Sequence, residues 1–214
     1  MNTVQNKKGS GSSLPAQRRE RERHEMRRMI LDAAMDLFVT EGYEQVSIRR
    51  IGEKIEYSPA TIYLYFKDKD EILYELHNDS FDRFYEAEVA VNALQDPLER
   101  LRALAKVYVN FGLSNPQHYE LMFILKAPAI HQAETRDWSR SFRTFDFLRG
   151  IVEDCLKAGR IRPGDPHAIS LGLWSLVHGF VSLLLRERMA MVPGEVRDRL
   201  VSQGLEYMME TIKA

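Results

Sequence analysis

Apolar residues recur along most of the chain at the three- and four-residue spacing of an amphipathic helix, and they nowhere alternate as in a half-buried strand. The clearest stripe is formed by Met26, Ile30, Ala33, Ala34, Leu37 and Phe38. It predicts a helix from about residue 18 to residue 41, after which Gly42 is suited to a left-handed helix end. Proline, glycine and Asx residues divide the rest of the chain into further segments of this kind. The pattern therefore predicts an all-α fold of about nine helices.

Capping residues indicate where these helices begin. Two short helices are expected at about residues 47–54 and 58–65, the second with a Ser-Pro start, and a longer one at about residues 68–90 with an Asp-x-x-Glu start. The later helices are expected to begin at about Asp96, Asn115, His131, Asp165 and Pro193. The helix that begins at His131 is expected to continue to about residue 158.

The two short helices have the features of a helix-turn-helix. The apolar residues that face one another across the pair are Ile48, Ile51, Ile55, Ile62 and Phe66. Gly52 and Ala60 are small enough for the helices to approach closely, and residues 56–58 form the short connection that the motif requires. The second helix presents Thr61, Tyr63 and Tyr65 on a face that the core does not need.

An ordinary helical hairpin would share this pattern, and the flanking residues favour DNA binding over that alternative. An arginine-rich helix start precedes the motif, and Lys67 and Lys69 follow it where they can meet phosphates. Residues 1–69 carry 13 basic and 10 acidic side chains, whereas residues 70–214 carry 17 and 21. The front of the chain is therefore mildly basic, as a local DNA-binding surface would be.

The arginines before the motif have two readings. Arg18, Arg19, Arg21 and Arg23 could enter the minor groove or follow the DNA backbone. Acidic residues are interleaved with them, so they could equally form i,i+4 pairs on a solvated helix start. We favour the solvated reading for Arg21 and Arg23.

Composition excludes several classes of protein. With 44% hydrophobic residues the chain can bury a sizeable core, and its single cysteine, Cys155, excludes an intramolecular disulfide or a cysteine zinc site. Pro166–Leu185 contains no charged residue and has the length of a bilayer span, but its histidines, serines and glycines favour a helix buried on two sides. We expect a cytoplasmic protein without membrane contact, and no catalytic residue, metal site or cofactor, since no nucleophile motif, phosphate loop or i,i+4 histidine pair is present.

The segment RRMILDAAMDLFVTEGYEQVSIRRIGEKIEYSPATIYLYFKDKDEIL resembles the N-terminal domain of the tetracycline-repressor (TetR/AcrR) family. In the second half, the Tyr119–Phe123 block and the spacing Trp174, His178, Gly179 resemble a C-terminal subclass with a Trp-His-Gly (WHG) signature. Two positions depart from the family pattern. Glu56 stands where a turn glycine is usual, which predicts a mildly strained backbone, and Gly52 stands where alanine is usual.

The glycine, serine and lysine content of residues 1–17 predicts a flexible tail. The resemblance implies a helix-turn-helix DNA-binding domain at 18–68 and a helical effector-binding and dimerisation domain at 69–214. It implies a one-component transcriptional repressor that binds a palindromic operator in double-stranded DNA as a homodimer. A small apolar or aromatic effector would release it. The alternative is a DNA-binding protein of the same fold without a small-molecule effector, either architectural or controlled by a protein partner.

The resemblance also assigns residues to the DNA interface. Ser47, Tyr63 and Lys69 are expected at phosphates, and Ser58 opens the recognition helix. The residues expected at base edges are Arg49, Pro59, Ala60, Thr61 and Tyr65. Arg49 is the best guanine reader in this set, and the apolar members leave part of the specificity to DNA shape.

Two further sets follow from the resemblance for the C-terminal half. The dimer interface is expected to contain Trp174, Val177, Val181, Leu184, Val201, Leu205 and Met208, although an intramolecular core could absorb the same residues. The effector pocket is expected to be lined by Tyr108, Phe111, Tyr119, Met122, Phe123, Trp138, Phe142 and Phe145, although each alone fits an ordinary core. His178 is expected to be a structural histidine whose polar atoms are satisfied in the core.

Overall fold

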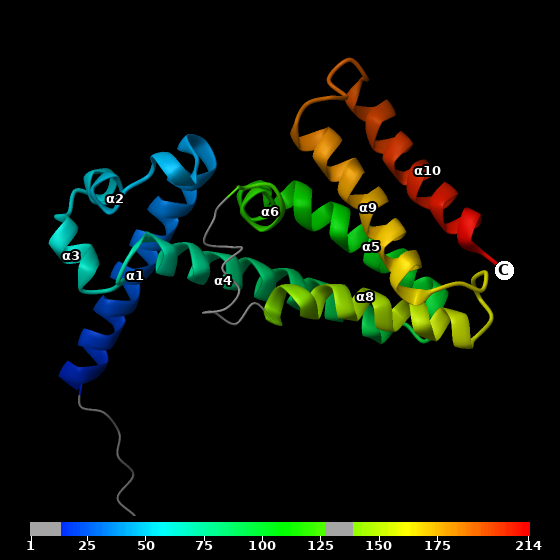
Figure 1. Cartoon of the computed structure of the whole chain (residues 1–214), viewed down its shortest axis with the longest axis horizontal. Coiled ribbons are helices and arrows are strands. Elements are labelled where there is room, and N and C mark those ends of the chain that lie inside the picture. Colours follow the sequence, from blue (N-terminus) through cyan, green and yellow to red (C-terminus); the bar gives the residue numbers. More distant parts are fainter. Residues whose placement is uncertain (1–13, 127–138) are drawn as a thin grey trace, which may run out of the picture.

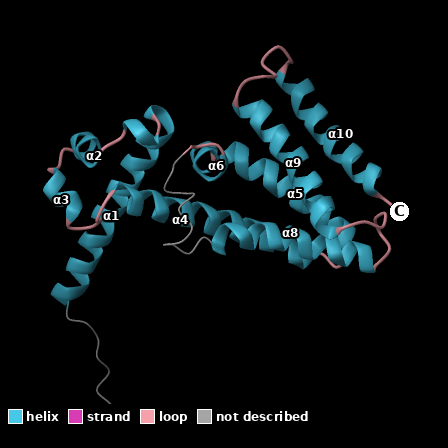
Figure 2. Cartoon of the chain, viewed as in Figure 1, coloured by secondary structure: helices cyan, strands magenta, loops and turns pink. Residues whose placement is uncertain are grey.

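A computed structural model describes residues 14–126 and 139–214. In this part of the chain the regular elements are nine α-helices and two 3₁₀ helices, with no strand, so the predicted all-α class is confirmed (Figure 2). The helices are α1 Leu14–Glu41, α2 Ile48–Ile55, α3 Pro59–Tyr63, α4 Lys69–Val89, α5 Pro97–Ser114, α6 Pro116–Phe123, α8 Ser139–Lys157, α9 Pro166–Leu185 and α10 Gly194–Ile212, with η1 at Tyr43–Gln45 and η2 at Ala90–Ala93. The expected helix start at His131 lies outside the described residues, and α1 begins four residues before residue 18, within the expected tail.

The predicted capping residues account for most of the helix starts. The side chains of Ser47, Ser58, Asp68, Asp96 and Asp165 each accept a hydrogen bond from a backbone N–H of the following first turn. These bonds satisfy donors that have no partner within the helix. Asn115 and Pro193 begin helices without a side-chain cap.

Two hydrophobic cores divide the described chain, and α4 takes part in both. The first core is formed by α1, η1, α2 and α3 together with Ile72, Leu73 and Leu76 of α4 and Leu121 of α6. The second core is formed by the rest of α4 and by α5, α6, α8, α9 and α10. Figure 1 shows α1–α3 at one end of the molecule and α8–α10 at the other, with α4 running between them. The packing of the first core thus extends beyond the domain boundary expected at residue 68.

Helix α9 is 20 residues long, with a mean hydropathy of 1.8, and is long and apolar enough to cross a membrane by length and composition alone. In the structure it packs against α5, α8 and α10, and Leu173, Val177 and Val181 are buried in the second core. Its opposite side leaves Leu176 and Leu183 exposed in the single chain. One face of α9 is therefore core, and the burial expected for its other face stays a prediction.

Candidate DNA-binding surface and effector pocket

The turn between α2 and α3 closes tightly on α2. The Tyr57 N–H donates to the Gly52 carbonyl at 2.9 Å, and a Cβ at Gly52 would lie 2.6 Å from the Tyr57 carbonyl oxygen. Glu56 adopts the expected left-handed conformation, with φ 62° and ψ 33°. The two departures from the family pattern are thus neighbours in space, and glycine at position 52 leaves room for the carbonyl that the turn brings in.

The outer face of α3 is free of the core, as a recognition helix requires. Ile62 is fully buried, whereas Pro59, Ala60 and Tyr63 are exposed, Tyr63 by 57%. Thr61 is half-buried, and its hydroxyl lies 3.0 Å from that of the capping residue Ser58. The exposure of Tyr63 leaves its hydroxyl accessible, and its contact with a DNA phosphate stays a prediction.

Tyr65 lies differently from the other α3 candidates. It follows the last residue of α3, and its half-buried side chain packs against the first core. Its carbonyl accepts a hydrogen bond from Arg27 of α1 at 2.7 Å. The Arg27 guanidinium also binds Glu75 of α4 and lies 4.2 Å from the Phe66 ring centroid, and pattern reading missed this link between α1, α3 and α4.

Ser47 and Arg49 lie at the start of α2. Ser47 Oγ accepts the Arg50 N–H at 3.1 Å and so caps the helix. The Arg49 side chain is 81% exposed and makes an i,i+4 ion pair in which Nε lies 2.9 Å from Glu53 Oε1. Exposed pairs of this kind contribute little, so Arg49 can exchange Glu53 for a base or phosphate.

Lys69 has an internal role that its expected phosphate contact did not include. Its ammonium donates to the carbonyls of Tyr43 and Val46 at 3.0 and 3.1 Å and lies 4.2 Å from the Tyr43 ring centroid. Two of its three donors are therefore used to hold the loop before α2 against the start of α4. Lys67 is exposed and Lys69 is half-buried, and the phosphate contacts expected of both stay predictions.

Gly42, at the start of the loop before α2, has φ 84° and ψ 147°, a positive-φ conformation outside the left-handed helical region expected for it.

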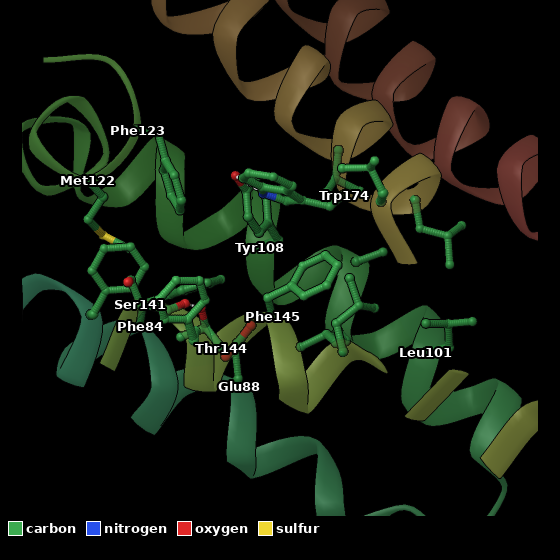
Figure 3. Close-up of a pocket in the computed structure, with 18 of the residues that line it drawn as sticks. Phe84, Glu88, Leu101, Tyr108, Met122, Phe123, Ser141, Thr144, Phe145 and Trp174 are labelled. Carbon is green, nitrogen blue, oxygen red and sulfur yellow. Dashed lines mark hydrogen bonds between the residues drawn. The ribbon is translucent and has the colours of Figure 1, made fainter. Parts of the chain in front are cut away.

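A cavity of about 460 Å³ lies in the second core between α4, α5, α6, α8, α9 and α10 (Figure 3). Its wall is mainly aromatic and aliphatic, with the rings of Phe81, Phe84, Tyr108, Phe123, Phe145 and Trp174 among the lining residues. The size and apolar character of the cavity are typical of small-molecule sites.

Five of the eight residues expected to line an effector pocket lie at this cavity. They are Tyr108, Met122, Phe123, Phe142 and Phe145. Phe111 and Tyr119 do not line it. The Phe111 ring packs behind Phe84 at 4.9 Å between centroids, and Tyr119 turns toward His178. Trp138 lies outside the described residues.

A hydrogen-bonded group of side chains forms one side of the cavity. Trp174 Nε1 donates to the Tyr108 hydroxyl at 3.1 Å. The hydroxyls of Tyr108 and Tyr119 lie 3.1 and 2.6 Å from His178 Nδ1. Burial lowers the pKa of His178 below its usual value, which favours the neutral ring. His178 thus has the hydrogen-bonded core position expected of a structural histidine.

Glu88 is the lining residue that sequence reasoning missed. Its side chain is 3% exposed, and its Oε2 has no hydrogen-bond partner. Burial raises the pKa of Glu88 to about 9, against the opposing effect of Arg143. A signal was available, because Glu88 continues the series His77, Phe81, Phe84 at i, i+4, i+7 and i+11 and so places an acid on the buried face of α4.

The seven residues expected at the dimer interface belong to the interior of the single chain. Trp174, Val177 and Met208 line the cavity, Val181, Val201 and Leu205 are buried in the second core, and Leu184 is half-buried against it. The alternative of an intramolecular core therefore describes their position. The exposed apolar residues of α9 and α10 include Leu176, Leu183, Leu200 and Tyr207, and we call these four, together with the half-buried Gly179 and Gly204, the α9/α10 face. Periodicity could not distinguish the two faces because α9 is apolar almost all round.

No group of three or more histidine, cysteine or acidic side chains in the described ranges is arranged to hold a metal ion. Cys155 is buried, and burial raises the pKa of its thiol to about 11.

Two family models match the chain. One, described as "Bacterial regulatory proteins, tetR family", matches residues 30–76, and the other, "Tetracyclin repressor-like, C-terminal domain", matches residues 101–208. A Bacillus subtilis protein named "Fatty acid metabolism regulator protein" is 32% identical over 145 residues, which cover 63% of this chain and 70% of that protein.

Solved structures share the fold. A TetR family transcription regulator from Marinobacter aquaeolei VT8 aligns with a TM-score of 0.70 and 17% identity over 92% of this chain and 98% of that one. AibR in complex with isovaleryl coenzyme A and operator DNA aligns with a TM-score of 0.67 and 21% identity over 87% and 97%. With the helix-turn-helix and the helical C-terminal half both matched, the chain belongs to the tetR family of DNA-binding transcriptional regulators.

Proposed function

We propose that the protein is a cytoplasmic repressor that binds a palindromic operator as a homodimer and leaves it when a small apolar or aromatic effector fills the cavity. The observation that carries this proposal is the cavity itself. A regulator of this family without a small-molecule effector would be expected to fill the space with its own side chains, whereas here about 460 Å³ is left open.

The path from the cavity to DNA runs along α4. Its first residue, Lys69, holds the loop before α2, and its later residues Phe84 and Glu88 line the cavity. A ligand that binds one tilt of α4 better than another changes the position of α3 and hence the match to a half-site. AibR, which shares the fold, was solved with both isovaleryl coenzyme A and operator DNA, and this supports a site for a small molecule in such a chain.

A second copy of the chain is the partner we assign to the α9/α10 face. The face has exposed leucines on both helices, and no atom would lie within 4 Å of a Cβ at Gly179, which leaves room for a helix of the second copy to approach closely. A two-fold dimer places two recognition helices on half-sites related by the same symmetry.

The test of the proposal is reciprocal binding. An operator is first selected from random double-stranded DNA with the purified protein, and aromatic and aliphatic compounds that bind the free protein are then titrated into the complex. We expect an effector to weaken operator binding by roughly 5–150-fold, and operator DNA to weaken effector binding by the same factor. Measurement of both affinities by fluorescence anisotropy and calorimetry checks this. If operator affinity stays unchanged with every compound that binds, the effector part of the proposal is wrong.

Arg49→Ala should weaken binding to the selected operator by roughly 1–3 kcal/mol and relax the preference at one base position. The reason is that the exposed guanidinium can make two hydrogen bonds to guanine that alanine cannot. Arg83→Ala removes the same charge from the exposed side of α4 and serves as the control, with little change in specificity. Identical base preferences for the wild type and Arg49→Ala would contradict a base-reading role.

A further inference from the structure

One acid and many aromatic rings meet in the cavity. Glu88 extends from α4 toward Thr144 and Phe145 of α8, and Phe84, Tyr108 and Trp174 surround the same space (Figure 3). No lysine or arginine is among the described residues that line the cavity. Oε2 of Glu88 is buried without a hydrogen-bond partner, which is costly, because buried polar atoms usually have a partner of some kind.

The charged and titratable groups around Glu88 do not supply that partner. The charge of Arg143 of α8 acts on Glu88, but its guanidinium binds Asp82 at 2.8 Å and lies 3.8 Å from the Tyr85 ring centroid. Burial lowers the pKa of His77 to about 4 and raises that of Tyr108, so both are neutral at pH 7. Among the described residues, the cavity therefore contains an acid that feels the charge of Arg143 but has no basic side chain beside it in the lining.

The geometry points to a hydrophobic ligand that carries one positively charged nitrogen, which the carboxylate of Glu88 neutralises inside the aromatic wall. This inference rests on the proposed effector role of the cavity and names the class of effector. A cation gains twice in this site, because it pairs with Glu88 away from water and lies against electron-rich ring faces. A neutral acceptor would gain a single hydrogen bond from the protonated acid, and an anion would meet an acid with no base.

Binding of such a cation must displace a proton. With a pKa of about 9 for Glu88, roughly 1% of the free protein carries the ionised group at pH 7. A bound cation favours the ionised form, and the proton passes to the buffer. Affinity for the cation should therefore rise about tenfold per pH unit from pH 7 and level off above pH 9.

Four naphthalene probes test the inference on the DNA-free protein. They are (2-naphthylmethyl)trimethylammonium, its uncharged carbon analogue 2-neopentylnaphthalene, the neutral acceptor 2-acetonaphthone, and the carboxylate anion 2-naphthaleneacetate. The ammonium does not titrate, so any proton change on binding comes from the protein. We expect the cation to bind at least about tenfold more tightly than the neopentyl analogue. Calorimetry in buffers of different ionisation enthalpy should show release of close to one proton per cation at pH 7.

Two matched variants locate the effect. Glu88→Gln should abolish the preference for the cation and the proton release, whereas Glu86→Gln, at an exposed position on the same helix, should keep both. Folding is not expected to fail in Glu88→Gln. The folded-state pKa of Glu88 lies above its unfolded value of 4.5, so the wild type loses stability as the pH rises between these values, and the glutamine variant should melt higher at pH 8.

Three outcomes would overturn the inference: equal binding of the cation and the neopentyl analogue, binding of the cation without proton release, or no binding of the cation. Tight binding of 2-acetonaphthone that persists in Glu88→Gln and weakens above pH 9 in the wild type would identify a neutral acceptor as the ligand class instead. All of these measurements use the protein without operator DNA. They can therefore show that the ligand class is wrong without showing that the cavity lacks an effector, which is tested by the operator titration.

Discussion

Replacing Leu176 by glutamate should give a folded monomer that no longer holds its operator. Leu176 is 37% exposed on the α9/α10 face, so the protomer itself tolerates a charge there. In a dimer the same carboxylate would be buried without a partner, at a cost of roughly 3 kcal/mol or more, which weakens dimerisation by a hundredfold or more. A monomer contacts one half-site only and loses most of the operator affinity. Sedimentation velocity and anisotropy with the selected operator check both effects.

The matched control for this variant is Leu94→Glu. Leu94 is a similarly exposed leucine at the end of η2, away from the α9/α10 face. It should remain dimeric and keep its operator affinity. If Leu176→Glu also sediments as a dimer, the second copy binds elsewhere on the molecule and the assignment of this face is wrong.

Leu205→Glu should have a different and larger effect, because it should unfold the C-terminal half. The Leu205 side chain is 5% exposed and packs in the second core. A buried glutamate without a partner costs several kcal/mol, against a total stability of ~5–15 kcal/mol for a typical domain. Circular dichroism should show lost helix content or a strongly lowered, broadened melting transition.

Leu200 lies on the same helix but is 42% exposed, so Leu200→Glu distinguishes the effect of a charge on the surface from that of a charge in the core. It should stay folded and weaken dimerisation, as Leu176→Glu does. A Leu205→Glu variant that melts like the wild type but is monomeric would instead place Leu205 at the interface, as its position in the α10 stripe first indicated.

The parts of the fold that depend on local chemistry were predictable. Ser47, Ser58, Asp68, Asp96 and Asp165 are short polar residues at helix starts, and a cap is decided by the few residues that follow it. The exposed Arg49 and Tyr63 could be found in the same way, because the spacing of the buried isoleucines in α2 and α3 determines which side faces outward.

The parts that depend on long-range packing were not predictable from pattern. Trp174 and Leu205 are apolar residues on helices with two apolar sides, and only the packed structure shows which side the protomer itself uses. The contacts of the Lys69 ammonium with the carbonyls of Tyr43 and Val46 could not be predicted because nothing local places these carbonyls beside it, and its phosphate contact stays a prediction. Glu88 was overlooked because an acid near the end of a helix is usually exposed.

Leu121 has a consequence for how such chains can be recombined. It is fully buried in the first core, although it belongs to α6, some thirty residues after the end of α4, and its neighbour Met122 lines the cavity. A fragment cut after α4 would lose this side chain and expose the apolar site that it fills. A graft of the first four helices onto another C-terminal half would inherit whatever residue that half brings to the same site. Exchange of DNA specificity between relatives therefore needs α6 to be transferred with the helix-turn-helix, or its contact residue to be matched.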